Sequence, residues 1–173
     1  QGVNSIFIHA LTDGRDTDPY SGKGYIADLE QNISNTSARI ASICGRYYTM
    51  DRDKRWERVK KGYDLMIHGK GKPFANAISA IEESYAAGIS DEFIEPVVIV
   101  NEEQKPLCTI QPNDVVICFN FRTDRLREIT TLLTQQDFPE FDMKTMPLYY
   151  LTMTRYDEQF KHIHIIYDKE DIT

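Results

Sequence analysis

The chain has 173 residues, of which 41% are hydrophobic, and 20 Lys and Arg against 27 Asp and Glu give it a net charge of −7. This length and apolar content fit one globular domain and exclude global disorder. The acidic balance argues against a broad nucleic-acid-binding face. No apolar run approaches the roughly 20 residues needed to span a bilayer. The start also lacks the basic region and cleavage pattern of a signal peptide, so we expect a cytoplasmic protein.

Short apolar runs alternate with amphipathic segments along the chain. We predict strands at 5–11, 39–44, 93–100, 115–119, 147–153 and 162–167, and helices at 24–37, 54–67, 74–87 and 124–135. This alternation predicts an α/β fold, a three-layer α/β/α sandwich with a mostly parallel central sheet. The runs at 93–100 and 115–119 are apolar throughout, which is typical of strands buried on both faces. We expect Gly88 to end the third helix.

The cysteines and the first residues bear on the origin of the chain. Cys44 and Cys118 lie in apolar, strand-like runs, and neither they nor Cys108 form a C-x-x-C pair. This odd number of cysteines predicts reduced thiols in a cytosolic protein. The chain begins with Gln and a strand pattern follows at once. We therefore interpret residues 1–173 as a single domain taken from a longer protein.

Three of the predicted strands are followed by segments that carry arginine. These segments are DGRDTDP at 13–19, GRYYTMDRDKRW at 45–56 and FNFRTDR at 119–125. Loops at the carboxyl ends of parallel strands share one edge of the sheet, so we expect the segments to meet. The guanidinium fork of arginine matches phosphate and carboxylate in a bidentate way. The predicted anion-binding residues are Arg15, Arg46, Arg52, Arg122 and Arg125, with Asp16 beside them to orient Arg15 or hold a substrate hydroxyl.

Each segment also has a purely structural interpretation. The first could be a turn with a solvated arginine, and Arg52 and Arg55 could simply pair with neighbouring carboxylates, which contributes roughly 0–1 kcal/mol at a surface. The third could be an ordinary helix start. The joint occurrence of all three favours the cleft. His9, inside a strand pattern, fits a hydrogen-bonded core residue better than a catalyst. The pair His162 and His164 is weak evidence for a metal.

At these motifs the chain resembles the cofactor-independent (2,3-bisphosphoglycerate-independent) phosphoglycerate mutases. HALTDGRDTDP is similar to that family's HAF-x-DGRD-x-x-P, and GRYYTMDRDKRWERV to its GRYYAMDRDKRW. FNFRTDR matches FNFR-x-DR, and TMTRYD at 152–157 matches T-M-T-x-Y-D. The four motifs occur in the family's order from about 5 to 157. The resemblance implies a role in glycolysis and gluconeogenesis, the interconversion of 3-phosphoglycerate and 2-phosphoglycerate.

The resemblance further implies a two-domain parent enzyme. A phosphatase-like domain, related to alkaline phosphatase, carries two divalent metal ions, usually manganese, and a serine that takes the phosphoryl group. An inserted domain holds the glycerate, and this chain resembles that inserted domain. By motif, the five arginines would grip phosphate and carboxylate, and Asp16 would contact the substrate hydroxyls and exchange a proton with them. No cofactor is expected in this chain itself.

The chain also departs from the family pattern. The nucleophilic serine, the Asp and His metal ligands, the G-V-H-S-H segment and the lysine that follows it have no counterpart. We therefore expect the isolated chain to be inactive and to act with the phosphatase-like domain of the same polypeptide. Two alternatives stay open: a non-catalytic phosphometabolite-binding or regulatory module, and a stand-alone phosphatase that uses His162 and His164 for metal.

Overall fold

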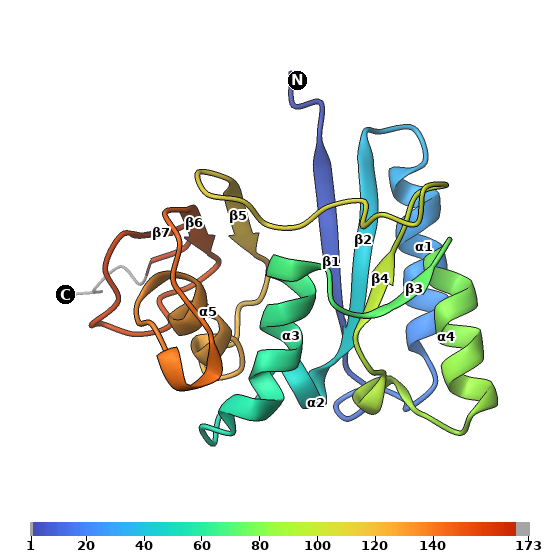
Figure 1. Ribbon diagram of the computed structural model, residues 1–173, viewed down its shortest axis with the longest axis horizontal. Coiled ribbons are helices and arrows are strands. Elements are labelled where there is room, and N and C mark those ends of the chain that lie inside the picture. The colour runs from blue at the N-terminus through green and yellow to red at the C-terminus, as the bar shows by residue number, and fades with distance from the viewer. Residues whose placement is uncertain (1, 169–173) are drawn as a thin grey trace.

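The computed structural model describes residues 2–168 (Figure 1). Its elements are β1 (Ile6–Thr12), α1 (Gly22–Ile33), β2 (Ala38–Gly45), α2 (Arg46–Thr49), α3 (Trp56–His68), β3 (Lys72–Phe74), α4 (Ala77–Ala86), η1 (Asp91–Phe93), β4 (Val97–Ile99), β5 (Val115–Cys118), α5 (Arg127–Thr134), η2 (Pro139–Phe141), β6 (Tyr149–Thr152) and β7 (Ile163–Ile165). No helix among these residues is both long and apolar enough to cross a bilayer. Every predicted strand and helix has a counterpart. The short elements α2 and β3 were not predicted.

The strands form two sheets, a four-stranded one in the order β1-β2-β4-β3 and a three-stranded one in the order β5-β6-β7. All neighbours pair in parallel except β2 and β4. The predicted α/β fold with mostly parallel strands is confirmed. The sequence predicts one central sheet, and the structure has two. Each sheet has an edge strand, β1 in one and β5 in the other, and within the described residues no ladder joins these two strands.

Helices cover both faces of the four-stranded sheet. On one face, Ile26 of α1 and Ile81 of α4 pack with Ile43 of β2. On the other, Leu65 of α3 packs with Cys44 of β2. The two inner strands are buried in consequence: most of β2 is buried, and Val97–Ile99 of β4 is buried at every position, as predicted for the run at 93–100.

Among residues 2–168, the three-stranded sheet is covered on one face only. Ile129 and Leu132 of α5 share a core with Cys118 of β5 and Tyr150 of β6. The opposite face of β5 is open: Val115 is 66% exposed and Ile117 is 56% exposed. The prediction that the run at 115–119 is buried on both faces is therefore wrong. An apolar run indicates that both faces of a strand are suited to burial. In β5 only one of the two faces is packed against a helix.

Local sequence explains where several helices begin and end. The side chain of Asn76 caps α4 by accepting a hydrogen bond from the Ser79 N–H at 2.9 Å. Gly69 ends α3 in the left-handed conformation. Gly88 follows α4 with φ 74, as its predicted stop requires. At α1, the buried Asp91 accepts the Gly22 N–H at 2.7 Å, which satisfies a helix N-terminal donor from a distant segment.

The three cysteines are free thiols, and Cys44 and Cys118 are buried, as predicted. Burial raises the pKa of both. Their thiols are therefore held in the neutral, unreactive form.

His9 of β1 is a hydrogen-bonded core residue, as predicted, with Nδ1 2.7 Å from Ser42 Oγ. Desolvation of the ring lowers its pKa from 6.5 to about 4. Between these two pKa values the unfolded chain binds a proton at His9 and the folded chain does not. The contribution of His9 to stability is therefore complete above about pH 6.5 and is lost as the pH falls towards 4. We expect the free energy of unfolding to fall by about 2 kcal/mol from this group between about pH 7 and pH 5.

Denaturant unfolding at both pH values measures this loss. His9→Gln keeps a polar partner for Ser42 and cannot titrate, so it should remove most of the pH dependence. An equal fall in the variant would show that other groups carry the effect.

Candidate anion-binding site

The loop after β1 is organised by the carboxylate of Asp13. Its Oδ1 accepts the backbone N–H groups of Arg15 and Asp16, both at 2.9 Å. Gly14 takes φ 65 in this turn, and a Cβ there would lie 2.7 Å from Asp91 Cβ, so the turn needs glycine. The result is a tight Asx turn that presents the side chain of Asp16 at the end of β1.

Arg46 follows β2 directly, and because β1 and β2 are parallel it lies at the same edge as Asp16. Its residue is 4% exposed. Nη1 donates to Asp13 Oδ1 at 2.7 Å and to Asp16 Oδ2 at 2.8 Å. Nη2 is buried without a hydrogen-bond partner. A buried guanidinium N–H group that makes no hydrogen bond is suited to donate one to an anion.

The loop after β5 reaches the same place from the other sheet. Arg122 Nη1 donates to Asp16 Oδ2 at 3.0 Å. From the loop before α3, Arg52 Nη1 donates to Asp124 Oδ2 at 2.8 Å. The side chains of Arg52 and Arg122 are about half exposed, so both can turn towards a ligand.

Arg125 shows most directly that the arginines gather. Its pKa is lowered, first by desolvation and then by repulsion from Arg46, Arg52 and Arg122, with Asp124 opposing. Its Nε is buried without a hydrogen-bond partner. We call Arg46, Arg52, Arg122 and Arg125 the arginine cluster. Arg125 Nε lies 3.9 Å from Asp124 Oδ2, an ion pair too long for a hydrogen bond. Four cations held close together, two of them with a buried N–H group that makes no hydrogen bond, favour an anion between them.

Asp16 is the carboxylate on which two members of the arginine cluster converge. The hydrogen bond from Arg46 is the main cause that lowers its pKa. The Asp16 carboxylate is therefore ionised, and both arginine contacts use Oδ2. Oδ1 is left to accept a hydrogen bond from a hydroxyl group.

Two arginines lie outside this arrangement. Arg15, a predicted site residue, has a 64% exposed side chain, and its contact is with Glu92 at 3.4 Å. Arg55 pairs with Asp51 and Asp53, as its structural interpretation predicted. Helix α5 begins at Arg127, later than the predicted 124, so Arg122 and Arg125 lie in the loop and turn before its N-cap, Leu126, and not in its first turn.

Two buried carboxylates hold the loop that carries Arg52: Asp51, which the sequence predicts near the start of the helix at 54–67, and Glu128, whose role was not predicted. Asp51 Oδ2 accepts the N–H groups of Asp53 and Arg55, both at 3.0 Å. Glu128 of α5 is 7% exposed, and its Oε1 accepts the Lys54 N–H at 2.8 Å. Lys54 has φ 58, a conformation that costs a non-glycine residue about 1 kcal/mol. An acidic residue in the apolar pattern of a helix was the available sign.

Glu128→Ala is expected to remove about 1 kcal/mol of stability and to free the Lys54 amide, because that N–H loses a charged acceptor. Glu128→Gln keeps a carbonyl acceptor and removes a carboxylate whose pKa burial raises, so it should resemble the wild type. Hydrogen exchange of the Lys54 amide reads out the difference. Fast exchange in both variants, or in neither, would show that Oε1 does not hold this loop.

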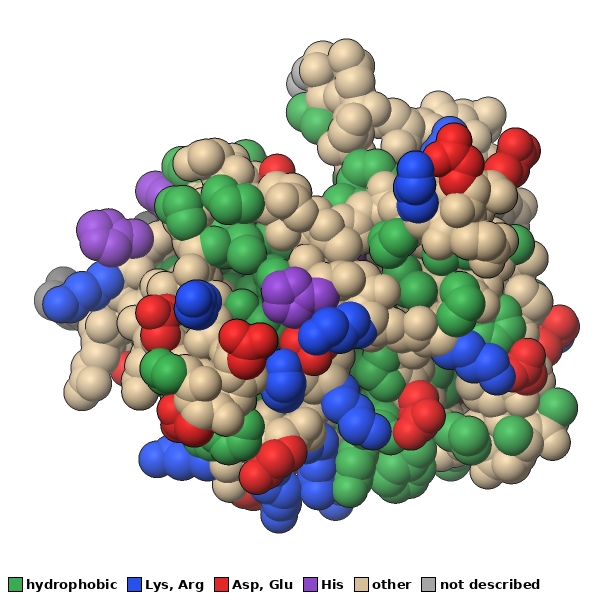
Figure 2. Space-filling model, in the orientation of Figure 1, with side chains coloured by type: hydrophobic (Ala, Val, Ile, Leu, Met, Phe, Trp, Pro, Cys, Tyr) green, Lys and Arg blue, Asp and Glu red, His purple; other side chains and the backbone are tan. Residues whose placement is uncertain are grey.

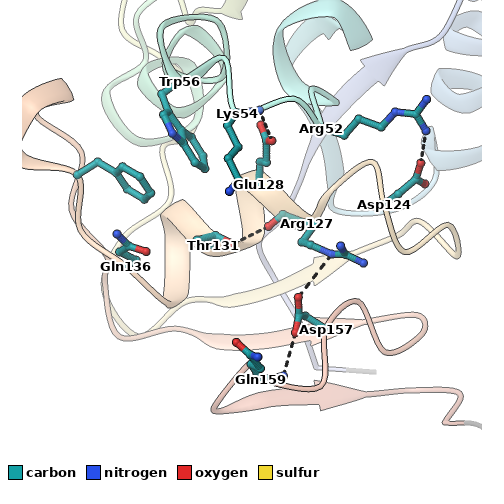
Figure 3. Close-up of a pocket in the computed structure, with 11 residues that line it drawn as sticks. Arg52, Lys54, Trp56, Asp124, Arg127, Glu128, Thr131, Gln136, Asp157 and Gln159 are labelled. Atoms are coloured by element: carbon teal, nitrogen blue, oxygen red, sulfur yellow. Dashed lines mark hydrogen bonds and ion pairs between the residues drawn. The ribbon is translucent and has the colours of Figure 1, made fainter.

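A pocket of about 680 Å³ adjoins the arginine cluster (Figure 3). Arg52 and Asp124 line it and also belong to the anion-binding site. On its far side, Arg127 pairs with Asp157, and Trp56 packs on Phe138 with ring centroids 4.4 Å apart. The pocket therefore extends the site with a polar wall and an aromatic wall.

The described residues give no support to a metal site. No group of three or more His, Cys, Asp and Glu side chains in 2–168 is placed to hold a metal ion. His164 stacks on Tyr149 at 4.1 Å, and Asp13, Asp16 and Asp124 each contact an arginine.

An ionised aspartate and an arginine cluster at the carboxyl edge of parallel strands make this edge the candidate site for a small anion in an α/β protein. The family model described as the N-terminus of BPG-independent PGAM matches residues 1–158. The chain is 56% identical to the 2,3-bisphosphoglycerate-independent phosphoglycerate mutase of Flavobacterium johnsoniae, over 99% of this chain and 34% of the relative. It is 55% identical to that of Parabacteroides distasonis, with the same coverage.

A solved structure agrees with these relatives. The crystal structure of Leishmania mexicana phosphoglycerate mutase at low cobalt concentration superposes with a TM-score of 0.84 at 35% identity, covering 91% of this chain and 30% of that one. The chain therefore belongs to the 2,3-bisphosphoglycerate-independent phosphoglycerate mutase family, as its motifs predicted. It spans about a third of the length of the curated relatives it matches.

Proposed function

We propose that this chain is the substrate-binding domain of a cytoplasmic phosphoglycerate mutase of glycolysis and gluconeogenesis. Its site would bind 3-phosphoglycerate and 2-phosphoglycerate. The phosphoserine intermediate and two divalent metal ions, manganese in our proposal, would belong to a phosphatase-like domain in the rest of the polypeptide. Family membership supports this assignment. So does the length of the relatives, which leaves room for a second domain in the same chain.

The observation that carries the proposal is the arginine cluster with its unpaired N–H groups. Arg46 Nη2 and Arg125 Nε are buried without hydrogen-bond partners, and both belong to a group of neighbouring cations. Phosphoglycerate carries a phosphate and a carboxylate, and both anions suit bidentate guanidinium contacts. A dianionic head group would relieve the repulsion that lowers the pKa of Arg125. One substrate would therefore both neutralise the positive charge of the cluster and accept hydrogen bonds from the two N–H groups.

In this proposal the chain orients glycerate and manages a proton. The arginine cluster holds the anionic groups so that the two hydroxyl positions of the glycerate face the phosphoryl donor in turn. Asp16, protonated when the substrate is bound, gives its proton to the glycerate oxygen from which the phosphoryl group leaves. Asp16 Oδ1 then takes a proton from the other hydroxyl as that oxygen attacks the phosphoserine, so Asp16 ends the turnover in its starting state. Arg46 lowers the pKa of Asp16, and a bound phosphate that partly neutralises the arginines would raise it. Asp16 would thus become a better base when substrate is present.

The test uses a grafted enzyme, the Flavobacterium johnsoniae relative with its aligned region replaced by this chain. We expect it to interconvert the two phosphoglycerates. Asp16→Asn should lower kcat about 100-fold or more with a smaller effect on KM, because it removes a proton acceptor. Arg39→Ala, an exposed arginine at the start of β2, is the matched control. A folded but inactive graft, or an Asp16→Asn graft with full activity, would contradict the proposal.

A further inference from the structure

The three-stranded sheet has an open apolar face that the anion-binding site does not use. Register places Val115 beside Tyr149, and Ile117 beside Leu151, which in turn lies beside His164. These side chains alternate with Cys118, Tyr150 and Thr152, which are buried on the α5 side. We call Val115, Ile117, Tyr149, Leu151 and His164 the open face. Hydrophobic side chains gather around β5 and β6 in the upper left of Figure 2.

The exposure of the open face is unusual for a sheet of this kind. Val115, Ile117 and Tyr149 are 66%, 56% and 51% exposed, and Phe119, just past β5, is 83% exposed. All three strands are parallel. Parallel sheets occur almost only with both faces covered, because their strands are apolar on both sides. Neighbouring exposed apolar residues on a protein surface mark an interaction site.

The two sheets differ in one helix layer. In the four-stranded sheet, α3 lies on one face and α1 with α4 on the other. Helices α3 and α5 share one core, so they form a common layer beside both sheets. The three-stranded sheet has this common layer and lacks a counterpart of α1 and α4 (Figure 1).

We propose that the open face binds an amphipathic helix from the two-thirds of the polypeptide that the full-length relatives have beyond the region aligned with this chain. A helix is the element that covers parallel strands, and an apolar stripe of Leu, Ile or Val would match Val115 and Ile117. A segment of the same polypeptide, joined by a short flexible linker, has a millimolar effective concentration at the open face. A second copy of the chain would have to be present at that concentration to compete with it. This inference rests on family membership and not on the proposed substrate.

Thiol labelling tests the occupant. In a Cys108→Ser background, Ile117→Cys places a thiol on the open face while Cys44 and Cys118 stay buried. We expect fast labelling in the isolated chain and labelling slower by about tenfold or more in the grafted enzyme. Tyr25→Cys on α1, where Tyr25 is 61% exposed, is the matched control and should react equally fast in both proteins.

Three results would overturn the proposal. Equal labelling of Ile117→Cys in the chain and in the graft would show that nothing in the longer polypeptide covers the face. Protection that grows with the concentration of the isolated chain, with a dimer in sedimentation, would assign the face to a second copy. Finally, Ile117→Lys should leave the Tm of the isolated chain unchanged and lower that of the graft. A Tm unchanged in both would show that no apolar partner packs there.

Discussion

Arg46→Ala is expected to abolish phosphoglycerate binding and to destabilise the chain. Arg46 is buried and makes two charge-assisted hydrogen bonds, to Asp13 and to Asp16. Its loss leaves the partly buried Asp13 without its main side-chain partner, which should cost about 2 kcal/mol of unfolding free energy. Loss of a buried guanidinium from the arginine cluster should weaken anion binding about 100-fold or more. Denaturant unfolding and a ligand titration measure the two effects separately.

Arg46→Lys separates charge from geometry. Lysine keeps one positive charge and cannot reproduce a planar fork that serves two carboxylates and a ligand. We expect it to recover part of the stability and little of the binding. Full binding by either variant would show that Arg46 only braces the loop after β1.

Gly45→Ala is expected to cost about 3 kcal/mol or more of stability, because it overpacks a site made of backbone. Gly45 ends β2 and donates its N–H to Ile94 O at 2.8 Å. A Cβ at this position would overlap the Glu92 carbonyl oxygen and lie 2.8 Å from Ile94 N. Backbone cannot swing away as a side chain can, so β2 and the η1 segment must separate. Arg46 is the next residue, so ligand binding should weaken with stability.

Gly24→Ala is the matched control for this substitution. Gly24 lies in α1, and a Cβ there meets nothing within 4 Å. Alanine is favoured over glycine in a helix, so the variant should be about 0.5 kcal/mol more stable than the wild type. Circular dichroism on thermal unfolding orders the three proteins. A Gly45→Ala variant as stable as wild type would show that the approach of β2 to Glu92 is not tight.

Sequence patterns predicted most elements because their local signals agree with their packing. The run predicted at 39–44 lies within β2, and the helical spacing of Trp56, Val59, Tyr63 and Met66 is one face of α3. The predictions that failed needed information about partners. Nothing in VVICF distinguishes a strand buried on both faces from one whose second face is open. A three-residue strand such as β3, inside a Gly- and Lys-rich turn, is too short for a periodic signal.

The candidate site divides in the same way. Arginines after three strands predicted a shared edge, and the structure brings Arg46, Arg52, Arg122 and Arg125 together. Sequence could not show that Asp16 would join two of them, because its contact with Arg122 crosses between the two sheets. Nor could it separate Arg52, which reaches Asp124, from Arg55, which pairs within its own loop. Long-range pairing depends on loop geometry that residue types alone do not encode. The role of Arg15 in substrate binding and the role of Asp16 in catalysis stay predictions.

The most direct test of the central claim is a titration of this chain with 3-phosphoglycerate, followed by NMR shifts of the amides in 13–16, 46–55 and 120–126. Three proteins are compared: wild type, Arg122→Ala and the surface control Arg39→Ala. Weak, saturable binding that is kept by Arg39→Ala and lost by Arg122→Ala is the predicted result. Equal binding by all three proteins, or shifts that never saturate in any of them, would contradict a phosphoglycerate site at the arginine cluster.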